Sequence, residues 1–556
     1  MPFIKIPQLL GRFYGSFCGG GLIIGTLFFA ASLTPSLLPR SEALQGVLSG
    51  ASFAAGYGIG VGLRALWYFL GFRNFLNPRA EKLVSLAAIV VCAAIALAFL
   101  WQASHWQNSI RVLMGLDTVD TIRPFFVGAI SCAVAIALLL IGRLFKLTFG
   151  YLSRVIDRIA PKRVSNLLAV IFAALLFWSL GSGVFLEAGL RLLDGSYKQY
   201  DALVSDEEDK PTDPLKSGST QSVLRWEDLG RAGREAISSA PTRAEIANFT
   251  GRDAKEPIRV YVGLNSADDI ETRARLTLEE MIRVGAFERS VVVIATPTGT
   301  GWLDPASHMP LEYLHHGDTA TVSVQYSYLA SWLALMVEPD YGAETSKAVF
   351  RVVYDHWLQM PENDRPKLYL HGLSLGAMNS DLSYDLFDIV GQPFDGALWA
   401  GPPFTSRTWR QATAGRNEGS PAWMPRFRDG SVIRFTGQDN YLDEAEAPWG
   451  PMRVVFLQYA SDPITFFEPN SLFRAPAWMR NPRGPDVSPS LRWFPVVTFL
   501  QLSLDMAIAT STPMGHGHVY APEHYVDAWV AVTQPEGWSP QDLQRLKNML
   551  ASTLKD

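Results

Sequence analysis

Ser374 lies in the pattern Gly-x-Ser-x-Gly, which is typical of enzymes that use a serine hydroxyl as the nucleophile. The pattern covers residues 372–376, between an expected strand at 367–370 and a helix-forming stretch at 377–389. Its two glycines permit the sharp turn that lifts the serine above a sheet and directs the Leu375 N–H toward a reacting carbonyl oxygen. The pattern alone is common by chance, so its strand-turn-helix context carries the prediction that Ser374 is catalytic.

A reactive serine needs a base to take its proton and an acidic group to orient that base. In enzymes with this turn, the acid and then a histidine follow the serine along the chain. Asp462 comes just after the expected strand 453–459 and is our candidate for the acid, with Asp439 and Asp443 as alternatives. The competing interpretation of Asp462 is structural, because an aspartate before proline also favours an Asx turn.

Two histidines near the end of the chain, His516 and His518, are the candidates for the base. Glycines flank both of them, and a final helix is expected to follow. Gly517-His518 followed by an apolar pair matches the usual end of such enzymes, so we favour His518 and keep His516 as the alternative. Alternate histidines supply too few ligands for zinc, so we expect neither a metal nor another cofactor.

The oxyanion of the tetrahedral intermediate needs a second hydrogen-bond donor besides the Leu375 N–H. One candidate loop follows the first expected strand and contains Asn265. Another follows the second expected strand and contains Thr298, Gly299 and Thr300. The sequence leaves both loops open.

β-Rich runs alternate with helix-length segments from residue 257 to residue 556. Strands are expected at 258–262, 290–296, 367–370, 397–400, 432–435 and 453–459, and helices from residues 268, 322 and 345. This alternation predicts a mostly parallel sheet covered on both faces, with the active site at the carboxyl ends of the strands. Residues 191–256 are polar and are expected to be a linker with one helix at 224–238.

The first 190 residues have a different composition from the rest of the chain. They hold 15 Lys/Arg and 6 Asp/Glu, whereas the whole chain of 556 residues has a net charge of −5. A helix needs about 20 apolar residues to cross a bilayer. Residues 1–190 are therefore predicted to be a helical membrane domain with about five transmembrane helices. Its uncharged runs cover residues 13–39, 43–63, 83–110, 124–142 and 164–186.

The positive charges between these runs predict the orientation of the chain. The N-terminus and the second and fourth loops carry 11 Lys/Arg, whereas the first and third loops carry 3. Positively charged loops stay in the cytoplasm, so an odd number of spans places everything after residue 190 outside it. The three cysteines all lie in the apolar half, so no disulfide framework is expected. The mild net charge argues against nucleic-acid binding.

Taken together, these motifs resemble the bacterial membrane-anchored alpha/beta-hydrolase family. The resemblance implies a membrane domain (1–190), a linker (191–256) and an α/β-hydrolase domain (257–556), with a triad of Ser374, Asp462 and one of the two histidines. Leu373 stands where an acidic residue is usual, so the resemblance brings no substrate. The motifs that carry it are residues 33–40, 298–302, 317–320, 325–328, 372–376, 398–403, 461–463, 484–487 and 515–518.

The function expected from these features is that of a membrane-tethered serine hydrolase of the esterase, lipase or thioesterase type. It would cleave a lipid or an acylated envelope molecule through an acyl-enzyme intermediate. Transfer of the acyl group to an alcohol is one alternative, and a non-catalytic membrane scaffold or transport protein is another. The expected partners are the acylated substrate and the lipids of the plasma membrane, and the oligomeric state is left open.

Overall fold

The computed structural model describes residues 18–72, 78–179, 210–329 and 340–554 of the chain. Packing divides the chain into two compact units. The helical unit comprises residues 1–189, 467–479 and 485–508. The sheet unit comprises residues 190–466, 480–484 and 509–556.

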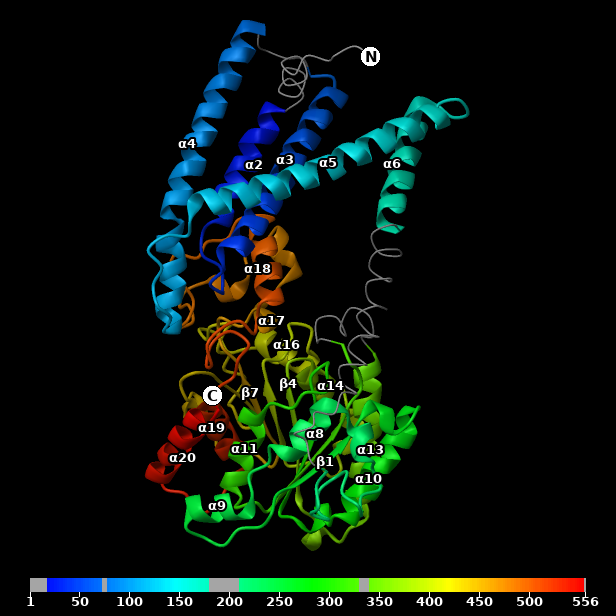
Figure 1. Cartoon of the computed structure of the whole chain (residues 1–556), viewed down its shortest axis with the longest axis vertical. Coiled ribbons are helices and arrows are strands. Elements are labelled where there is room, and N and C mark those ends of the chain that lie inside the picture. The colour runs from blue at the N-terminus through cyan, green and yellow to red at the C-terminus, as the bar shows by residue number, and fades with distance from the viewer. Residues whose placement is uncertain (1–17, 73–77, 180–209, 330–339, 555–556) are drawn as a thin grey trace. The chain divides into compact units, whose positions relative to one another are not determined.

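Among the described residues, four helices of the helical unit are long and apolar enough to cross a membrane, where the sequence predicted about five spans. The first expected span, 13–39, contains only the 14-residue helix α2 (Gly19–Ser32) among the described residues. Pro35 and Pro39 follow α2, and proline cannot continue a helix because it lacks the N–H group. The four long helices are α3 (Glu42–Phe69), α4 (Pro78–Arg111), α5 (Pro124–Ile156) and α6 (Lys162–Ser179) (Figure 1).

Glycines let α3 approach both of its neighbours closely. A Cβ added at Gly60 would lie 2.5 Å from the Cα of Gly21 in α2. A Cβ added at Gly50 would lie 2.6 Å from the carbonyl oxygen of Ser131 in α5. Small residues on a helix face favour such packing in lipid, so α3 is the central helix of this unit.

A segment from late in the chain completes the helical unit. Residues 467–479 and 485–508 belong to it, although they follow most of the sheet along the chain. Their main element is α18 (Val497–Ala507), which packs on α2 and α3. We refer to residues 467–508 as the insertion, of which residues 480–484 belong to the sheet unit.

Seven parallel strands form the sheet, in the order β1-β3-β2-β4-β5-β7-β6. Nearly every strand residue is buried, as expected for a parallel sheet covered on both faces. The predicted fold class, a helical membrane region followed by an α/β domain with a mostly parallel sheet, is confirmed. The strands are β1 (Ile258–Val262), β2 (Val291–Thr296), β3 (Thr319–Val324), β4 (Lys367–Leu373), β5 (Gly396–Ala400), β6 (Ile433–Thr436) and β7 (Arg453–Leu457).

Helices surround this sheet (Figure 1). Helix α10 (Ile270–Arg283) packs on α13 (Tyr341–Gln359), whereas α11 (Pro305–Leu314) packs on α19 (Pro522–Thr533), which also contacts β5 and β7. The remaining helices are α8 (Gly230–Ser238), α9 (Arg243–Thr250), α14 (Leu375–Asp381), α15 (Leu386–Ile389), α16 (Arg407–Ala414), α17 (Pro463–Phe466) and α20 (Pro540–Thr553).

Two helices predicted from the sequence were wrong. The helix expected from Val322 is part of strand β3, which pairs with β1 and β2 and is buried along its whole length. Its run of threonine, valine and serine fits a strand better than a helix, because β-branched side chains pack well on a pleated surface. The stretch 377–389 forms two short helices, α14 and α15, interrupted at residues 382–385.

Candidate active site

Ser374 occupies the sharp turn between β4 and α14. Its φ is 58° and its ψ is −128°, a strained conformation for a residue with a side chain. A Cβ added at Gly372 would lie 2.4 Å from the carbonyl carbon of Gly376. A Cβ added at Gly376 would lie 2.2 Å from the carbonyl oxygen of Thr296. Both glycines of the pattern are therefore required by close backbone contacts, and the serine lies at the carboxyl edge of the sheet.

Asp462 and His518 are in direct contact. Asp462 follows β7, and its Oδ2 lies 2.7 Å from His518 Nδ1. The Tyr520 hydroxyl donates to the same oxygen at 2.7 Å, and Oδ1 accepts the Ile464 N–H at 2.8 Å. The Asp462 side chain is 0% exposed and that of His518 is 7% exposed, so water does not screen the pair. This contact favours the tautomer in which Nδ1 carries the proton and Nε2 is free to accept one.

The free nitrogen of His518 lies in a buried setting. Its Nε2 atom is buried and has no hydrogen-bond partner within the part of the chain that the structure describes. A buried polar atom without a partner is unusual, and it requires an explanation such as a catalytic role.

Gly401 links the position of Ser374 to that of His518. The Ser374 N–H donates to the carbonyl oxygen of Ala400, at the end of β5, at 2.9 Å. A Cβ added at Gly401 would lie 2.7 Å from His518 Cε1 and 2.8 Å from Tyr520 Cε2. Ser374 thus contacts Ala400, and the His518 ring borders the next residue, Gly401, at the end of β5. The serine, this glycine and Asp462 follow the neighbouring strands β4, β5 and β7.

His516 has a different set of contacts from His518. Its Nδ1 lies 3.3 Å from Gln438 Nε2, and it forms an isolated antiparallel bridge with Val519. Its carbonyl oxygen accepts a hydrogen bond from Thr512 Oγ1 at 2.7 Å. Of the two histidines, His518 is the one that contacts the candidate acid, and His516 supports the loop.

The loop after β2 lies closer to the serine turn than the loop after β1. Strand β2 pairs directly with β4, and Gly376 packs against the carbonyl oxygens of Thr296 and Pro297. Strand β1, which precedes Asn265, is separated from β4 by β3 and β2. The side-chain oxygen of Asn265 also accepts a hydrogen bond from the Tyr328 hydroxyl at 2.6 Å. The arrangement therefore favours the loop after β2 as the source of the second oxyanion donor.

Within the loop after β2, the amide groups differ in their partners. The Thr298 N–H donates to the carbonyl oxygen of Trp302 at 3.1 Å, and the Gly301 N–H donates to that of Thr298 at 2.9 Å. The Thr300 N–H has no hydrogen-bond partner among the described residues. Gly299 takes part in another interaction and is therefore not counted as free. Thr300 therefore offers a free amide among the described residues of this loop.

Two titratable residues that sequence reasoning missed lie near the triad candidates. Burial and the neighbouring Asp462 carboxylate raise the pKa of Tyr520, so its hydroxyl remains a donor to that carboxylate. Burial raises the pKa of Asp304, which caps α11 by accepting the Ala306 N–H at 3.0 Å, to about 7. The position of Tyr520, two residues after His518, was the available sequence signal, whereas nothing in the sequence marked Asp304.

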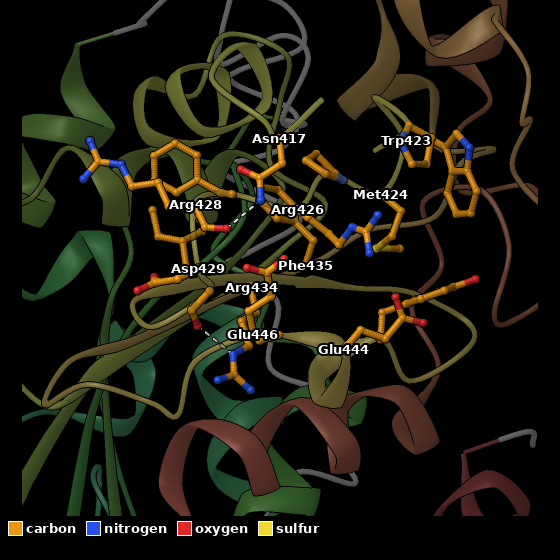
Figure 2. A pocket seen from close by; sticks show the side chains of 17 residues that line it. Asn417, Trp423, Met424, Arg426, Arg428, Asp429, Arg434, Phe435, Glu444 and Glu446 are labelled. Atoms are coloured by element: carbon orange, nitrogen blue, oxygen red, sulfur yellow. Dashed lines mark hydrogen bonds between the residues drawn. The ribbon is translucent and has the colours of Figure 1, made fainter. Parts of the chain in front are cut away.

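A cavity of about 310 Å³ lies beside the edge strand β6, and none of the three triad candidates lines it (Figure 2). Its charged residues are exposed except for Arg434, whose guanidinium donates to three backbone carbonyl oxygens and lies over the ring of Trp449. Arg434 therefore holds the wall together and offers little to a ligand. Among the described residues, no group of three or more His, Cys, Asp or Glu is arranged to bind a metal.

Two family models match the chain. The model described as the alpha/beta-hydrolase family matches residues 258–546, and the model described as the N-terminus of that family matches residues 33–241. No curated protein and no solved structure matched. The first model covers more than half of the chain, including the seven-stranded parallel sheet and the serine turn. The chain therefore belongs to the alpha/beta-hydrolase family, as its motifs predicted.

Proposed function

We propose that this protein is a membrane-anchored serine hydrolase with a triad of Ser374, His518 and Asp462. The observation that carries the proposal is the 2.7 Å contact between His518 Nδ1 and Asp462 Oδ2. The His518 ring borders Gly401, which directly follows the residue whose carbonyl accepts the Ser374 N–H. Membership of the alpha/beta-hydrolase family supports a hydrolase activity in general. The retained order of serine, acid and histidine supports the serine mechanism in particular.

In the proposed mechanism, Ser374 Oγ attacks the acyl carbonyl carbon while His518 Nε2 takes the hydroxyl proton. Asp462 stabilises the positive charge that forms on the imidazole ring. The N–H groups of Leu375 and Thr300 donate to the oxyanion of the tetrahedral intermediate. His518 then gives its proton to the leaving alcohol or thiol, and water hydrolyses the acyl-enzyme with the same ring as the base.

The proposed substrate is an ester or thioester of a lipid or of an acylated envelope molecule. Four apolar helices support a membrane-embedded N-terminal half, which keeps the site near amphipathic molecules. The excess of Lys/Arg at the N-terminus and in two of the loops supports a cytoplasmic N-terminus at the plasma membrane. An extracytoplasmic sheet unit requires in addition that the chain segment containing α2 crosses the membrane, as the four long helices can.

Labelling with a fluorophosphonate probe tests this function directly. The probe is expected to label the full-length protein in detergent micelles and to lose this reaction in Ser374→Ala. Ser380→Ala is the matched control, because Ser380 is a buried serine in α14, the helix that follows Ser374, and its Oγ accepts a hydrogen bond from Trp399 Nε1. Probe labelling that is absent from the wild type, or that persists in Ser374→Ala, would contradict the assignment.

The products formed from an acyl ester test the reaction type. The free acid is expected to be the main product, both in buffer and in the presence of glycerol. A new glycerol ester in place of the acid would identify an acyltransferase that uses the same residues.

A further inference from the structure

The irregular segment between α2 and α3, residues 33–40, takes no part in the proposed chemistry, yet it is almost entirely buried. Its two prolines keep it out of either helix. Its three leucines, Leu33, Leu37 and Leu38, each have 0% exposure. A buried segment without regular secondary structure needs partners for its backbone N–H and C=O groups.

The partner is the insertion, which contacts this segment through a buried ion pair. Arg40 Nε lies 3.5 Å from Asp505 Oδ1 in α18, and both side chains are 0% exposed. The Arg40 guanidinium also donates to Gln45 Oε1 at 2.9 Å and to Ser36 Oγ at 2.5 Å. Asp505 Oδ2 accepts the Leu37 N–H at 3.0 Å. Removal of one member of such a pair leaves a buried charge without its counterion, which is strongly destabilising.

Further hydrogen bonds join the insertion to the N-terminal part of the helical unit. Gln501 Nε2 donates to the carbonyl oxygen of Thr34 at 3.0 Å. The hydroxyl of Ser488 lies 2.7 Å from that of Ser109 in α4. The attachment therefore involves α4 and the segment 33–40 as well as the ion pair, and all of these contacts lie within the helical unit.

Along the chain, the insertion lies between the candidate acid and the candidate base. Asp462 precedes its first residue, Phe467, by only five positions. Ala509, the residue directly after the insertion, accepts the His518 N–H through its carbonyl oxygen at 3.0 Å. Both ends of the insertion thus continue into the loops that hold the proposed triad.

We propose that Arg40 and Asp505 are positioning residues for the hydrolase reaction. By attaching the insertion to the membrane helices, the pair fixes the loops that carry Asp462 and His518. The catalytic part of this inference rests on the proposed function, whereas the attachment does not. Displacement of a catalytic group by about 1 Å lowers the rate about 100-fold. A small movement of the insertion, transmitted through these short connections to the loops that carry Asp462 and His518, is therefore sufficient to lower the rate.

Cleavage of the linker tests the attachment. A protease site inserted between Asp213 and Pro214 of the full chain gives one fragment with Arg40 and another with Asp505. The wild-type fragments are expected to co-elute in detergent after cleavage. Arg40→Met and Asp505→Asn are each expected to lower the co-eluting fraction at least tenfold. The double variant, which has neither charge, is expected to lose less than either single variant.

The buried pair Arg259–Glu312 provides a matched control. Its atoms lie 2.7 Å apart, its side chains are 6% and 0% exposed, and both residues belong to the sheet unit. Glu312→Gln therefore removes a buried charge that lies entirely within one fragment. We expect the fragments of this variant to co-elute as in the wild type, so a general loss of stability is distinguished from a loss of attachment.

The positioning role is tested with the uncut full chain and a short, soluble p-nitrophenyl ester. Each single variant is expected to lower kcat at least tenfold and to leave KM within about twofold, because neither residue contacts substrate in the proposed site. The double variant is expected to recover most of the lost kcat. A purely structural defect would instead lower the amount of active protein, which titration with the fluorophosphonate probe measures.

The outcomes separate the two proposals. Single variants that co-elute like the wild type overturn the attachment, and single variants with unchanged kcat per active site overturn the positioning role. A wild type that neither turns over the ester nor reacts with the probe, but whose co-elution responds as expected, refutes the hydrolase function. The attachment of the insertion then stands without it.

Discussion

Replacement of Gly401 by alanine tests whether the His518 ring must lie where the structure has it. The new Cβ would lie 2.7 Å from His518 Cε1, whereas ordinary contacts begin at 3.4 Å, so the ring has to retreat by about 0.7 Å. The same Cβ would lie 2.8 Å from the ring of Tyr520, which donates to Asp462 and therefore cannot move freely. A displacement of this order costs about 100-fold in rate, and we expect kcat for a p-nitrophenyl ester to fall by that factor.

A second glycine separates this effect from backbone strain. Gly401 has a φ of +50°, and Gly419 has a φ of +81° with no atom within 4 Å of an added Cβ. Alanine in this region costs about 1–2 kcal/mol, so both variants should have a lower melting temperature. Only Gly401→Ala should also lose kcat. If its kcat stayed within threefold of the wild-type value, the assignment of His518 as a base confined beside this strand end would be refuted.

Two further predictions concern the acid and a buried carboxyl group. Asp462→Asn is expected to lower kcat about 10⁴-fold, because it favours the wrong imidazole tautomer of the histidine. His516→Gln should keep kcat within a few-fold of the wild-type value. Steady-state kinetics on both variants tests these expectations. Asp304 has a folded-state pKa of about 7, above its ordinary value of 3.8, so the folded protein holds a proton that the unfolded chain releases between these values. The stability contribution of this group is therefore lost as pH rises from about 4 to about 7, by about 4 kcal/mol in total at about 1.4 kcal/mol per pKa unit. Asp304→Asn keeps the helix cap and cannot ionise. In thermal unfolding, the melting temperature of this variant relative to that of the wild type should therefore rise from pH 5 to pH 8. A constant difference in melting temperature would contradict the raised pKa.

The candidate site was largely accessible from the sequence because its residues lie beside strand signals. Ser374 and Asp462 each follow a β-rich run, and parallel strands bring such positions to one edge. The choice between His516 and His518 rested on local glycine spacing, and the contact with Asp462 is a stronger reason for the same choice. The hydrogen bond from Tyr520 to Asp462 was not predictable, because it depends on how a loop folds against a strand 58 residues away in the chain.

The errors in the fold have a common cause, which is that short segments take their structure from distant neighbours. The helix expected from Val322 is strand β3, because the six residues 319–324 carry no period long enough to separate the two structures. The insertion follows most of the sheet along the chain. Its helix α18 is instead stabilised by contacts with α2 and α3, more than 400 residues earlier, which no local pattern records.

Arg40 is a charged residue whose position is understood only from a contact with a distant part of the chain. In the proposed orientation it lies in the first loop, on the side that positive residues tend to avoid. During synthesis Asp505 does not yet exist, so Arg40 then counts as an unpaired positive charge against the 11 in the cytoplasmic segments. In the proposed orientation, the excess of positive charge in the cytoplasmic segments outweighs this single arginine. The pairing with Asp505 in the finished protein explains why an arginine stands there at all, since both side chains are 0% exposed. The exception to the charge rule in the proposed orientation and the proposed attachment of the insertion thus rest on the same buried ion pair.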